Sequence, residues 1–345
     1  MNTQGNQVPL SQEKIKIAVV IPCFKVKHHI LDVLSRIGKE CGAIYVVDDY
    51  CPEETGKFVL AKNRDRRVTV LFHKSNQGVG GATLTGMSQA AQDGADVIVK
   101  LDGDGQMDPD LIPCLTAPIL YGEADYTKGN RFYRLETINR MPAIRIFGNA
   151  VLSFFSKASS GYWNIFDPTN GFIAIHASVL SELPIEKINR RFFFESDMLF
   201  RLYTIRAVIV EVPMVPVYGD EKSNLKIGKI VFPFMMYHAK NMFKRIFYTY
   251  FLRNFSIASI YLILAVLLIV PGVLIGAVYW YSLSSKGITA TSGTVMMASL
   301  PIIIGFQILL AFIAFDTTNI PSSPIHPKLS FLKAIHRARE HRVVD

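Results

Sequence analysis

From Val99 to Pro109 the sequence reads VKLDGDGQMDP, which places Asp102, Asp104 and Asp108 directly behind an apolar run. Carboxylates this close together repel one another, so a cation is expected among them. The glycine between the first two aspartates lets both carboxylates turn toward one point, and Gln106 can add a neutral oxygen. Hard oxygen ligands of this kind suit Mg²⁺ or Mn²⁺. The stretch therefore predicts a divalent-metal site at the end of a strand.

Two other interpretations of this stretch remain open. A calcium loop of EF-hand type would want an acid or Asn where Gln106 stands and Gly where Met107 stands, and Pro109 interrupts it. An ordinary polar turn is the second alternative, because Asp-Gly is common turn chemistry.

Strand and helix patterns alternate through the first two thirds of the chain. The continuous apolar runs typical of buried strands are 16–24, 43–49, 67–73 and 95–104. The segments between these runs have helical spacing. This order predicts an α/β domain with a mainly parallel sheet, whose ligands lie at the carboxyl ends of the strands.

A second acidic pair, Asp48 and Asp49, ends the second of these runs. Because the carboxyl ends of parallel strands meet at one edge of a sheet, we expect both acidic pairs on the same rim. The alternative for this pair is to cap a helix that is expected to begin near Pro52, a role that Asp49 can combine with ligand binding. The glycines of NQGVGGA, at 76–82, favour a close approach of the next helix to a ligand, without the Gly-Lys-Ser/Thr ending of a P-loop.

Beyond residue 125 the pattern is less regular. The elements expected there are a strand, an amphipathic helix, a turn and a second helix, at 125–132, 141–159, 167–172 and 192–206. Glu195 and Asp197 fall in the first turn of the second helix, where acidic side chains interact favourably with the helix dipole.

Two stretches near the C-terminus, 255–281 and 294–315, contain no charged residue. Each exceeds the roughly 20 residues that cross a bilayer as a helix, although two buried core helices are the alternative. Basic residues flank the pair on both sides, which predicts a hairpin with both flanks in the cytoplasm. They are Lys240, Lys244, Arg245 and Arg253 before the first stretch, and Lys328, Lys333, Arg337, Arg339 and Arg342 after the second.

Composition fits this organisation, with 50% hydrophobic residues in the 345-residue chain and a formal net charge of +9. Much of the excess charge flanks the spans, where anionic lipid headgroups rather than nucleic acid are the expected partner. The segment before the first span mixes aromatic, Met and basic residues, which predicts interfacial helices with Lys and Arg reaching outward. The four cysteines form no CxxC pair, so free thiols are expected.

The expected domain map has five parts. They are a disordered N-terminus, an α/β domain, interfacial amphipathic helices, a transmembrane hairpin and a basic cytoplasmic tail, at 1–14, 15–225, 226–253, 254–316 and 317–345.

In order along the chain, the motifs IPCFKV, VVDD, NQGVGGA, LDGDGQMDP, KGNRF and DPTNGF resemble those of family 2 glycosyltransferases of GT-A fold. The similarity is strongest to the polyprenyl-phosphate glycosyltransferases, the group that includes dolichyl-phosphate mannose synthase, and it covers about residues 15–225. It implies a Rossmann-like catalytic domain followed by the hairpin of a two-span, membrane-anchored subgroup. The implied reaction moves a sugar from a nucleotide sugar to a polyprenyl phosphate, with Mg²⁺ or Mn²⁺ as cofactor.

Bacterial two-span relatives mostly use UDP-sugars. The resemblance therefore favours a UDP-sugar and undecaprenyl phosphate at a bacterial inner membrane, with GDP-mannose-dependent dolichyl-phosphate mannose synthesis as the alternative. The apolar hairpin and aromatic interfacial helices also suit self-association into a homo-oligomer.

The resemblance assigns roles to the residues that match its motifs. The donor site would comprise Pro22, Phe24, Asp48, Asp49, Gln77, Gly78, Gly80, Asp102 and Asp104. The metal would be held by Asp102, Asp104 and Gln106. The acceptor phosphate would meet Arg131, Arg145, Asn149, Lys222 and Ser223, with Lys226 as a further substitute for an arginine of the family that is missing here. Asp104, Arg131 and Asp167 would be catalytic, and Asp167, Glu195 and Asp197 are candidates for contacts to sugar hydroxyls.

Two other functions compete with this one. A processive polysaccharide synthase of the same superfamily would carry a Gln-x-x-Arg-Trp element, but Trp163 and Trp280 are each preceded by Tyr. A non-catalytic membrane scaffold that retains the domain for docking is the other alternative. Retention of Asp102, Asp104 and Arg131 argues against the scaffold.

Overall fold

A computed structural model describes residues 15–133, 143–214 and 227–332. Within these residues, seven strands form one mixed sheet in the order β3-β2-β1-β4-β6-β5-β7. Strand β6 runs antiparallel to β4 and β5, and the other neighbouring strands pair in parallel. The strands are β1 (Ile17–Cys23), β2 (Cys41–Asp48), β3 (Val68–Phe72), β4 (Val97–Lys100), β5 (Tyr126–Asn130), β6 (Ile173–His176) and β7 (Ile209–Pro213).

This sheet confirms the mainly parallel α/β domain that the apolar runs predict. Strands β6 and β7 were not expected, because short apolar runs of four and five residues carry too little periodicity to separate a strand from a helix. Cys23 pairs with Asp48, and Val20 pairs with Lys100. The carboxyl ends of β1, β2 and β4 therefore lie at one edge of the sheet, here called the acidic rim.

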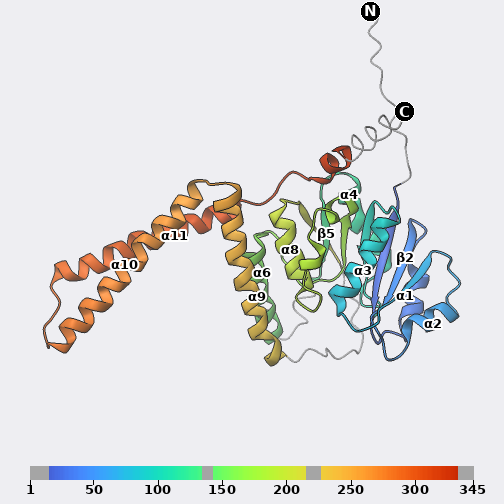
Figure 1. Cartoon of the computed structure of the whole chain (residues 1–345), viewed down its shortest axis with the longest axis horizontal. Coiled ribbons are helices and arrows are strands. Elements are labelled where there is room, and N and C mark those ends of the chain that lie inside the picture. The colour runs from blue at the N-terminus through green and yellow to red at the C-terminus, as the bar shows by residue number, and fades with distance from the viewer. Residues whose placement is uncertain (1–14, 134–142, 215–226, 333–345) are drawn as a thin grey trace, which may run out of the picture.

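Helices cover both faces of the sheet (Figure 1). Val20 and Val47 pack toward α3 and α8 on one face, and Val19 and Val46 pack toward α1 and α4 on the other. Because alternate residues of a strand face opposite sides, a strand covered on both faces reads as a continuous apolar run. The helices are α1 (Ile30–Arg36), α2 (Thr55–Lys62), α3 (Val79–Gln92), α4 (Ile112–Leu120), α6 (Ala143–Ser160), α7 (Ala177–Leu180) and α8 (Phe194–Thr204), with 3₁₀ turns at Pro109–Leu111 and Ile185–Lys187.

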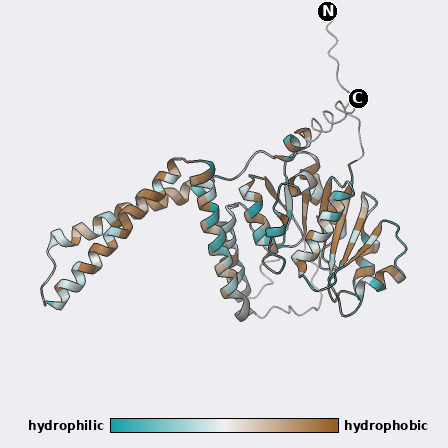
Figure 2. Ribbon diagram, viewed as in Figure 1, coloured by the Kyte–Doolittle hydropathy of each residue, from teal (hydrophilic) through white to brown (hydrophobic). Residues whose placement is uncertain are grey.

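Two long apolar helices, α10 (Ile257–Ser285) and α11 (Ser292–Thr318), lie side by side and project from the domain (Figures 1 and 2). A Cβ on Gly272 would lie 2.8 Å from Ile302, and one on Gly305 would lie 2.7 Å from Ile269, so the two helices pack closely at these glycines. Each helix is long and apolar enough to cross a bilayer, and only 11% of its most apolar window is buried. Such exposure does not fit core helices of a soluble domain and suggests a membrane anchor.

Helix α9 (Ile227–Phe247) and a π-helical turn (Tyr248–Arg253) connect the domain to α10. Aromatic side chains such as Phe232 and Phe243 are exposed on α9, as expected of an interfacial helix. Arg245 departs from the expectation that the basic residues of this segment reach outward. It is buried, and its Nη1 lies 2.6 Å from Oδ1 of Asp316 near the end of α11.

Asp316 ties the apolar helices to the α/β domain. Besides the ion pair with Arg245, its carboxylate accepts hydrogen bonds from the Tyr250 hydroxyl at 2.7 Å and from Trp163 Nε1 at 3.0 Å. Trp163 lies between α6 and β6, and Tyr250 lies in the π-helical turn. One buried carboxylate thus holds three segments together at the base of the hairpin.

The segment after α11 returns to the α/β domain (Figure 1). Ile325 and Leu329 pack against the core. The buried carboxylate of Asp125, just before β5, accepts hydrogen bonds from the backbone N–H groups of Ile325 at 2.9 Å and His326 at 2.8 Å, and from that of Val208 at 2.8 Å. Burial opposes the negative charge, but the His326 imidazole, whose Nδ1 lies 2.9 Å from Oδ1, and these N–H groups hold the pKa of Asp125 below its usual value. At least the first part of the expected tail is therefore attached to the domain.

We expect Asp125→Asn to destabilise the protein by about 3 kcal/mol, because buried donors lose a charged acceptor. Thermal unfolding in detergent measures the loss, and limited proteolysis reports release of the segment around Ile325. A carboxylate with a lowered pKa stabilises the folded state above its unfolded pKa, and this contribution disappears as the pH falls through the folded pKa. The difference from the wild type should therefore shrink in acid.

Asp110→Asn is the matched control, since the Asp110 side chain is 75% exposed. Equal unfolding temperatures for wild type and Asp125→Asn at neutral pH would contradict the assignment of Asp125 as a clamp.

Candidate active site at the acidic rim

The cation closest to Asp102 is a lysine of the strand that precedes it. Lys100 lies at the end of β4 with 1% of its side chain exposed, and its Nζ is 2.8 Å from Oδ1 of Asp102 and 3.6 Å from Oε1 of Glu195. Burial disfavours the charge on Lys100, but the two carboxylates outweigh it and hold the pKa of Lys100 above its usual value. The sequence did not predict this role for Lys100, because the position of a lysine in an apolar strand does not show which group its side chain contacts.

Gly171, in the turn at 167–172, lies directly on this ion pair. A Cβ at Gly171 would collide with Nζ of Lys100 and would lie 3.0 Å from Oδ2 of Asp102. A side chain at this position would displace one of the paired groups. The glycine of DPTNGF is therefore explained by the close approach of the turn to the lysine.

The two other acids of the opening stretch have separate partners. Asp104 is partly exposed, and its Oδ1 accepts a hydrogen bond from the backbone N–H of Gln106 at 3.0 Å. Asp108 forms an ion pair with Arg36 and accepts from the N–H of Asp110 at 3.2 Å, at the start of a 3₁₀ turn. Asp108 thus turns away from a shared ion, which argues against the calcium-loop alternative.

The donor set at the acidic rim fits a divalent cation that is shared with a substrate. Asp102 and Asp104 offer hard carboxylate oxygens, both side chains are partly exposed, and Gln106 is exposed beside them. Among the described residues, no three His, Cys, Asp or Glu gather into a metal-binding group. Mg²⁺ is commonly held by one or two carboxylates plus substrate phosphates, so the two aspartates suffice for that mode of binding.

Asp48 and Asp49 are buried, and each holds a loop. Asp48 accepts from the N–H groups of Cys51 at 2.7 Å and Gly56 at 2.6 Å, so it is Asp48 that satisfies the start of α2. Of the two acids expected to cap this helix, Asp48 takes that role and Asp49 does not, because the chain turns through positive φ at Glu54 and α2 begins only at Thr55.

Asp49 instead fixes the NQGVGGA loop. Its two carboxylate oxygens accept from the N–H groups of Gln77 and Gly78, each at 2.8 Å, and Oδ1 lies 2.7 Å from Nδ1 of His73. The buried carboxylates of Asp48 and Asp49 therefore hold the loops that surround the site.

The glycines of this loop make room for another segment of the chain. A Cβ on Gly78 would lie 2.7 Å from the carbonyl oxygen of Arg190, and one on Gly80 would lie 2.7 Å from that of Asn189. The expectation that these glycines serve a close approach to ligand is therefore not needed to explain them. The contact brings the exposed Arg190 beside the loop, where its Nη1 donates to Oε1 of Gln77 at 2.6 Å.

Arg131 is held in place by Asp167. Nε of Arg131 lies 2.8 Å from one carboxylate oxygen of Asp167, and Nη2 lies 2.9 Å from the other. Asp167 is fully buried, whereas 32% of the Arg131 side chain is exposed. The carboxylate of Glu211 fixes the turn by accepting a hydrogen bond from the backbone N–H of Asp167 at 2.8 Å. Asp167 thus orients Arg131, and this geometry gives it a positioning role.

The two acids at the start of α8 differ. Glu195 faces the Lys100–Asp102 pair at the rim. Asp197 accepts from the N–H of Asn189 at 2.9 Å and from Nδ2 of Asn241 at 3.0 Å, and Nε of Arg201 lies 3.1 Å from its Oδ2. A structural role at the start of α8 therefore suits Asp197. Glu195 remains a candidate for contacts to sugar hydroxyls.

The remaining predicted residues are placed only in part. Pro22 is half-buried near the end of β1, and Phe24 is exposed just beyond it. Asn149 is partly exposed on α6, and Arg145 belongs to the same helix at a position whose side chain is not described. Lys222, Ser223 and Lys226 lie outside the described residues.

The sequence of this chain is similar to those of known proteins over the residues that form the rim. The profile described as Glycosyl transferase family 2 matches residues 18–184, which contain both acidic pairs, Arg131 and the 167–172 turn. Over these residues the chain is similar to glycosyl transferase family 2.

Relatives of this chain include lipid-phosphate glycosyltransferases. The UDP-N-acetylglucosamine–dolichyl-phosphate N-acetylglucosaminyltransferase of Methanococcus voltae is 29% identical over 63% of this chain and 93% of that protein. The undecaprenyl-phosphate mannosyltransferase of Micrococcus luteus is 27% identical over 63% of this chain and 90% of that protein. Glucosyl-3-phosphoglycerate synthase from Mycobacterium tuberculosis, solved with Mn²⁺ and uridine-diphosphate, is 16% identical with a TM-score of 0.49 over 67% of this chain and 78% of that one.

Gly171→Ala should destabilise the protein by about 1–3 kcal/mol, because a methyl group would overpack the contact with Lys100. Thermal unfolding measures this loss. Gly148→Ala in α6 is the control, since nothing lies within 4 Å of the position its Cβ would take and alanine favours a helix. If the two variants unfold at the same temperature, Gly171 does not pack on the ion pair as described.

Proposed function

We propose that this protein is a membrane-anchored, inverting glycosyltransferase that transfers a sugar from a nucleotide sugar to a polyprenyl phosphate. One observation carries the proposal. The turn at 167–172 contacts the Lys100–Asp102 pair through Gly171 and holds Arg131 through Asp167. A rim of carboxylates that suits a diphosphate with its cation thus lies beside an oriented guanidinium that suits a second phosphate.

The chemistry follows from charge. An acceptor phosphate whose second pKa is about 6 is mostly a dianion at neutral pH, and needs no general base to become a nucleophile. Its oxygen forms a bond to the anomeric carbon of the sugar while the bond from that carbon to the nucleoside diphosphate breaks. Attack from the side opposite the leaving group inverts the anomeric configuration.

The residues of the rim would divide this work. Arg131, oriented by Asp167, binds the acceptor phosphate, and Lys100 keeps a positive charge beside Asp102. A divalent cation held by Asp102 and Asp104, with Gln106 beside them, would neutralise the leaving diphosphate. Glu195 faces the same space and is placed to accept from a sugar hydroxyl.

The names of the relatives support the acceptor class. Dolichyl and undecaprenyl phosphates are the acceptors named for the two similar enzymes, and α10 and α11 would keep the rim near such lipids. We favour a UDP-sugar as donor and undecaprenyl phosphate as acceptor, with the domain and both termini in the cytoplasm. GDP-mannose is the alternative donor.

The direct test incubates membranes that hold the protein with undecaprenyl phosphate and a panel of nucleotide sugars, and identifies the lipid product by mass. A lipid-phosphate sugar should form with one donor of the panel. A growing glycan would instead indicate a polysaccharide synthase. No product, together with no nucleotide binding with or without Mn²⁺, would favour a scaffold.

Asp104→Ala should lower transfer at least about 100-fold, because the charge of the leaving diphosphate is no longer compensated at the rim. The unfolding temperature should stay close to that of the wild type, since Asp104 is partly exposed. Asp110→Ala changes charge by the same amount on the exposed 3₁₀ turn and should leave transfer unchanged. Normal turnover by Asp104→Ala would remove Asp104 from the site.

Arg131→Ala should raise KM for the polyprenyl phosphate about 30-fold and leave KM for the nucleotide sugar nearly unchanged, because charge-assisted contacts to phosphate are strong. Arg131→Lys should recover little, since a lysine cannot make the two-pronged contact with Asp167. Arg66→Ala, at an exposed position in the loop before β3, is the control. Equal losses for both substrates would place Arg131 elsewhere in the reaction.

A further inference from the structure

A basic groove runs between α8 and the segment formed by α9 and the π-helical turn. It consists of two adjacent cavities of about 650 Å³ and 320 Å³, which share Thr204 and Tyr248 as lining residues. We call it the α8–α9 groove. Its basic lining residues are Lys187, Arg201, Lys240 and Lys244 in the larger cavity, and Arg206 and Arg253 in the smaller one.

The positive charges of this groove outnumber the negative charges among its lining residues. The acid that lines it, Asp197, is paired with Arg201 at 3.1 Å and accepts two further hydrogen bonds from the protein. Within the described part of the chain, the ammonium groups of Lys187, Lys240 and Lys244 have no carboxylate at ion-pair distance. The larger cavity therefore presents three positive charges to whatever enters it, and an anion is the expected occupant.

Helix α9 relates the groove to the membrane. Tyr237, Lys240, Lys244 and Tyr248 follow one another at spacings of three and four residues, so they share one side, and all four line the groove. Exposed apolar side chains occupy another side of the same helix. These residues are Phe232, Met236, Phe243 and Phe247. A helix with an apolar stripe beside lysines and tyrosines is typical of the lipid headgroup layer.

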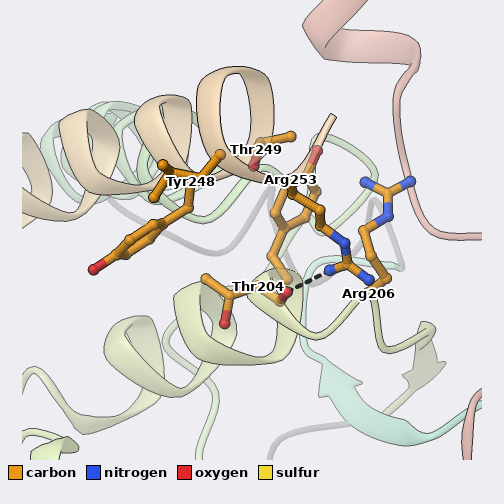
Figure 3. Close-up of a pocket in the computed structure, with 7 residues that line it drawn as sticks. Thr204, Arg206, Tyr248, Thr249 and Arg253 are labelled. Atoms are coloured by element: carbon orange, nitrogen blue, oxygen red, sulfur yellow. Dashed lines mark hydrogen bonds between the residues drawn. The ribbon is translucent and has the colours of Figure 1, made fainter. Parts of the chain in front are cut away.

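The far end of the groove lies next to the first apolar helix. Figure 3 shows Arg206 and Arg253 at the smaller cavity, where Nη1 of Arg253 donates to the carbonyl oxygen of Thr204 at 2.6 Å. Arg253 precedes the start of α10 at Ile257 by four residues. With α10 and α11 in a bilayer, this end of the groove lies at the membrane surface.

We propose that the α8–α9 groove binds the phosphate headgroup of an anionic phospholipid and so fixes the α/β domain against the membrane surface. The proposal rests on the membrane anchor and not on the sugar-transfer reaction. None of the six basic residues of the groove belongs to the acidic rim. Lys187 and Arg201 come from the α/β domain, while Lys240 and Lys244 come from α9, so a headgroup held between them would join the two parts.

The experiment measures binding of short-chain phosphatidylglycerol to the full-length protein in detergent, without donor or acceptor. Short-chain phosphatidylcholine and inorganic phosphate are the comparison ligands. Phosphatidylglycerol should bind at least about tenfold more tightly than either. Lys187→Gln should weaken its binding about fivefold, and Lys240→Gln with Lys244→Gln about 25-fold, as expected for the loss of one and two charges beside a headgroup.

Lys39→Gln with Lys62→Gln is the matched control, because it removes two exposed positive charges outside the groove, near the C-terminal ends of α1 and α2. This control should bind phosphatidylglycerol like the wild type. Unfolding temperatures without added lipid show whether each variant is folded.

Four results would count against the proposal. Equal binding of phosphatidylcholine would remove the role of charge, and equal binding of inorganic phosphate would remove the lipid. Displacement of phosphatidylglycerol by undecaprenyl phosphate would assign the groove to the acceptor. An unchanged affinity in Lys187→Gln would also count against it, since general attraction of a basic helix to a membrane does not require a lysine of the α/β domain.

Discussion

The ion pair between Lys100 and Asp102 is the interaction on which the acidic rim depends. An isolated charge at either position would be costly, because Lys100 is buried and Asp102 lies where other carboxylates gather. In the ion pair each charge compensates the other, and Glu195 of α8 adds a second carboxylate 3.6 Å from Nζ of Lys100. The rim therefore holds a fixed positive charge before any substrate arrives. A divalent cation would add positive charge to a rim where carboxylates outnumber this lysine.

The 167–172 turn connects this pair to the rest of the site. Gly171 lies on Lys100 and Asp102, and Asp167 at the other end of the turn holds the guanidinium of Arg131. Glu211 fixes the turn through two backbone N–H groups, and burial raises the pKa of this carboxyl group above its usual value. The distance between the Lys100–Asp102 pair and Arg131 is thus set by a short, internally bonded segment.

The sequence predicted those parts of the site that depend on neighbours along the chain. Asp102 and Asp104 were placed correctly at a strand end, because apolar runs followed by acids mark the carboxyl edge of a parallel sheet. What it missed depends on distant segments. The loop at 189–191, more than 100 residues from NQGVGGA, explains Gly78 and Gly80. Likewise, nothing local to Arg245 indicates that Asp316 is its partner.

That partnership constrains how the α/β domain is held against the two apolar helices. A carboxylate near the end of an apolar helix is costly unless it is paired, and Asp316 receives donors from Arg245, Tyr250 and Trp163. Because these donors belong to the α/β domain and its connection to α10, the hairpin cannot turn relative to the domain without breaking the network. With α10 and α11 in a bilayer, the height of the acidic rim above it would be fixed by this network. In the proposed reaction, a phosphate carried on a long lipid would then reach the rim by lateral diffusion, with no rearrangement of the anchor.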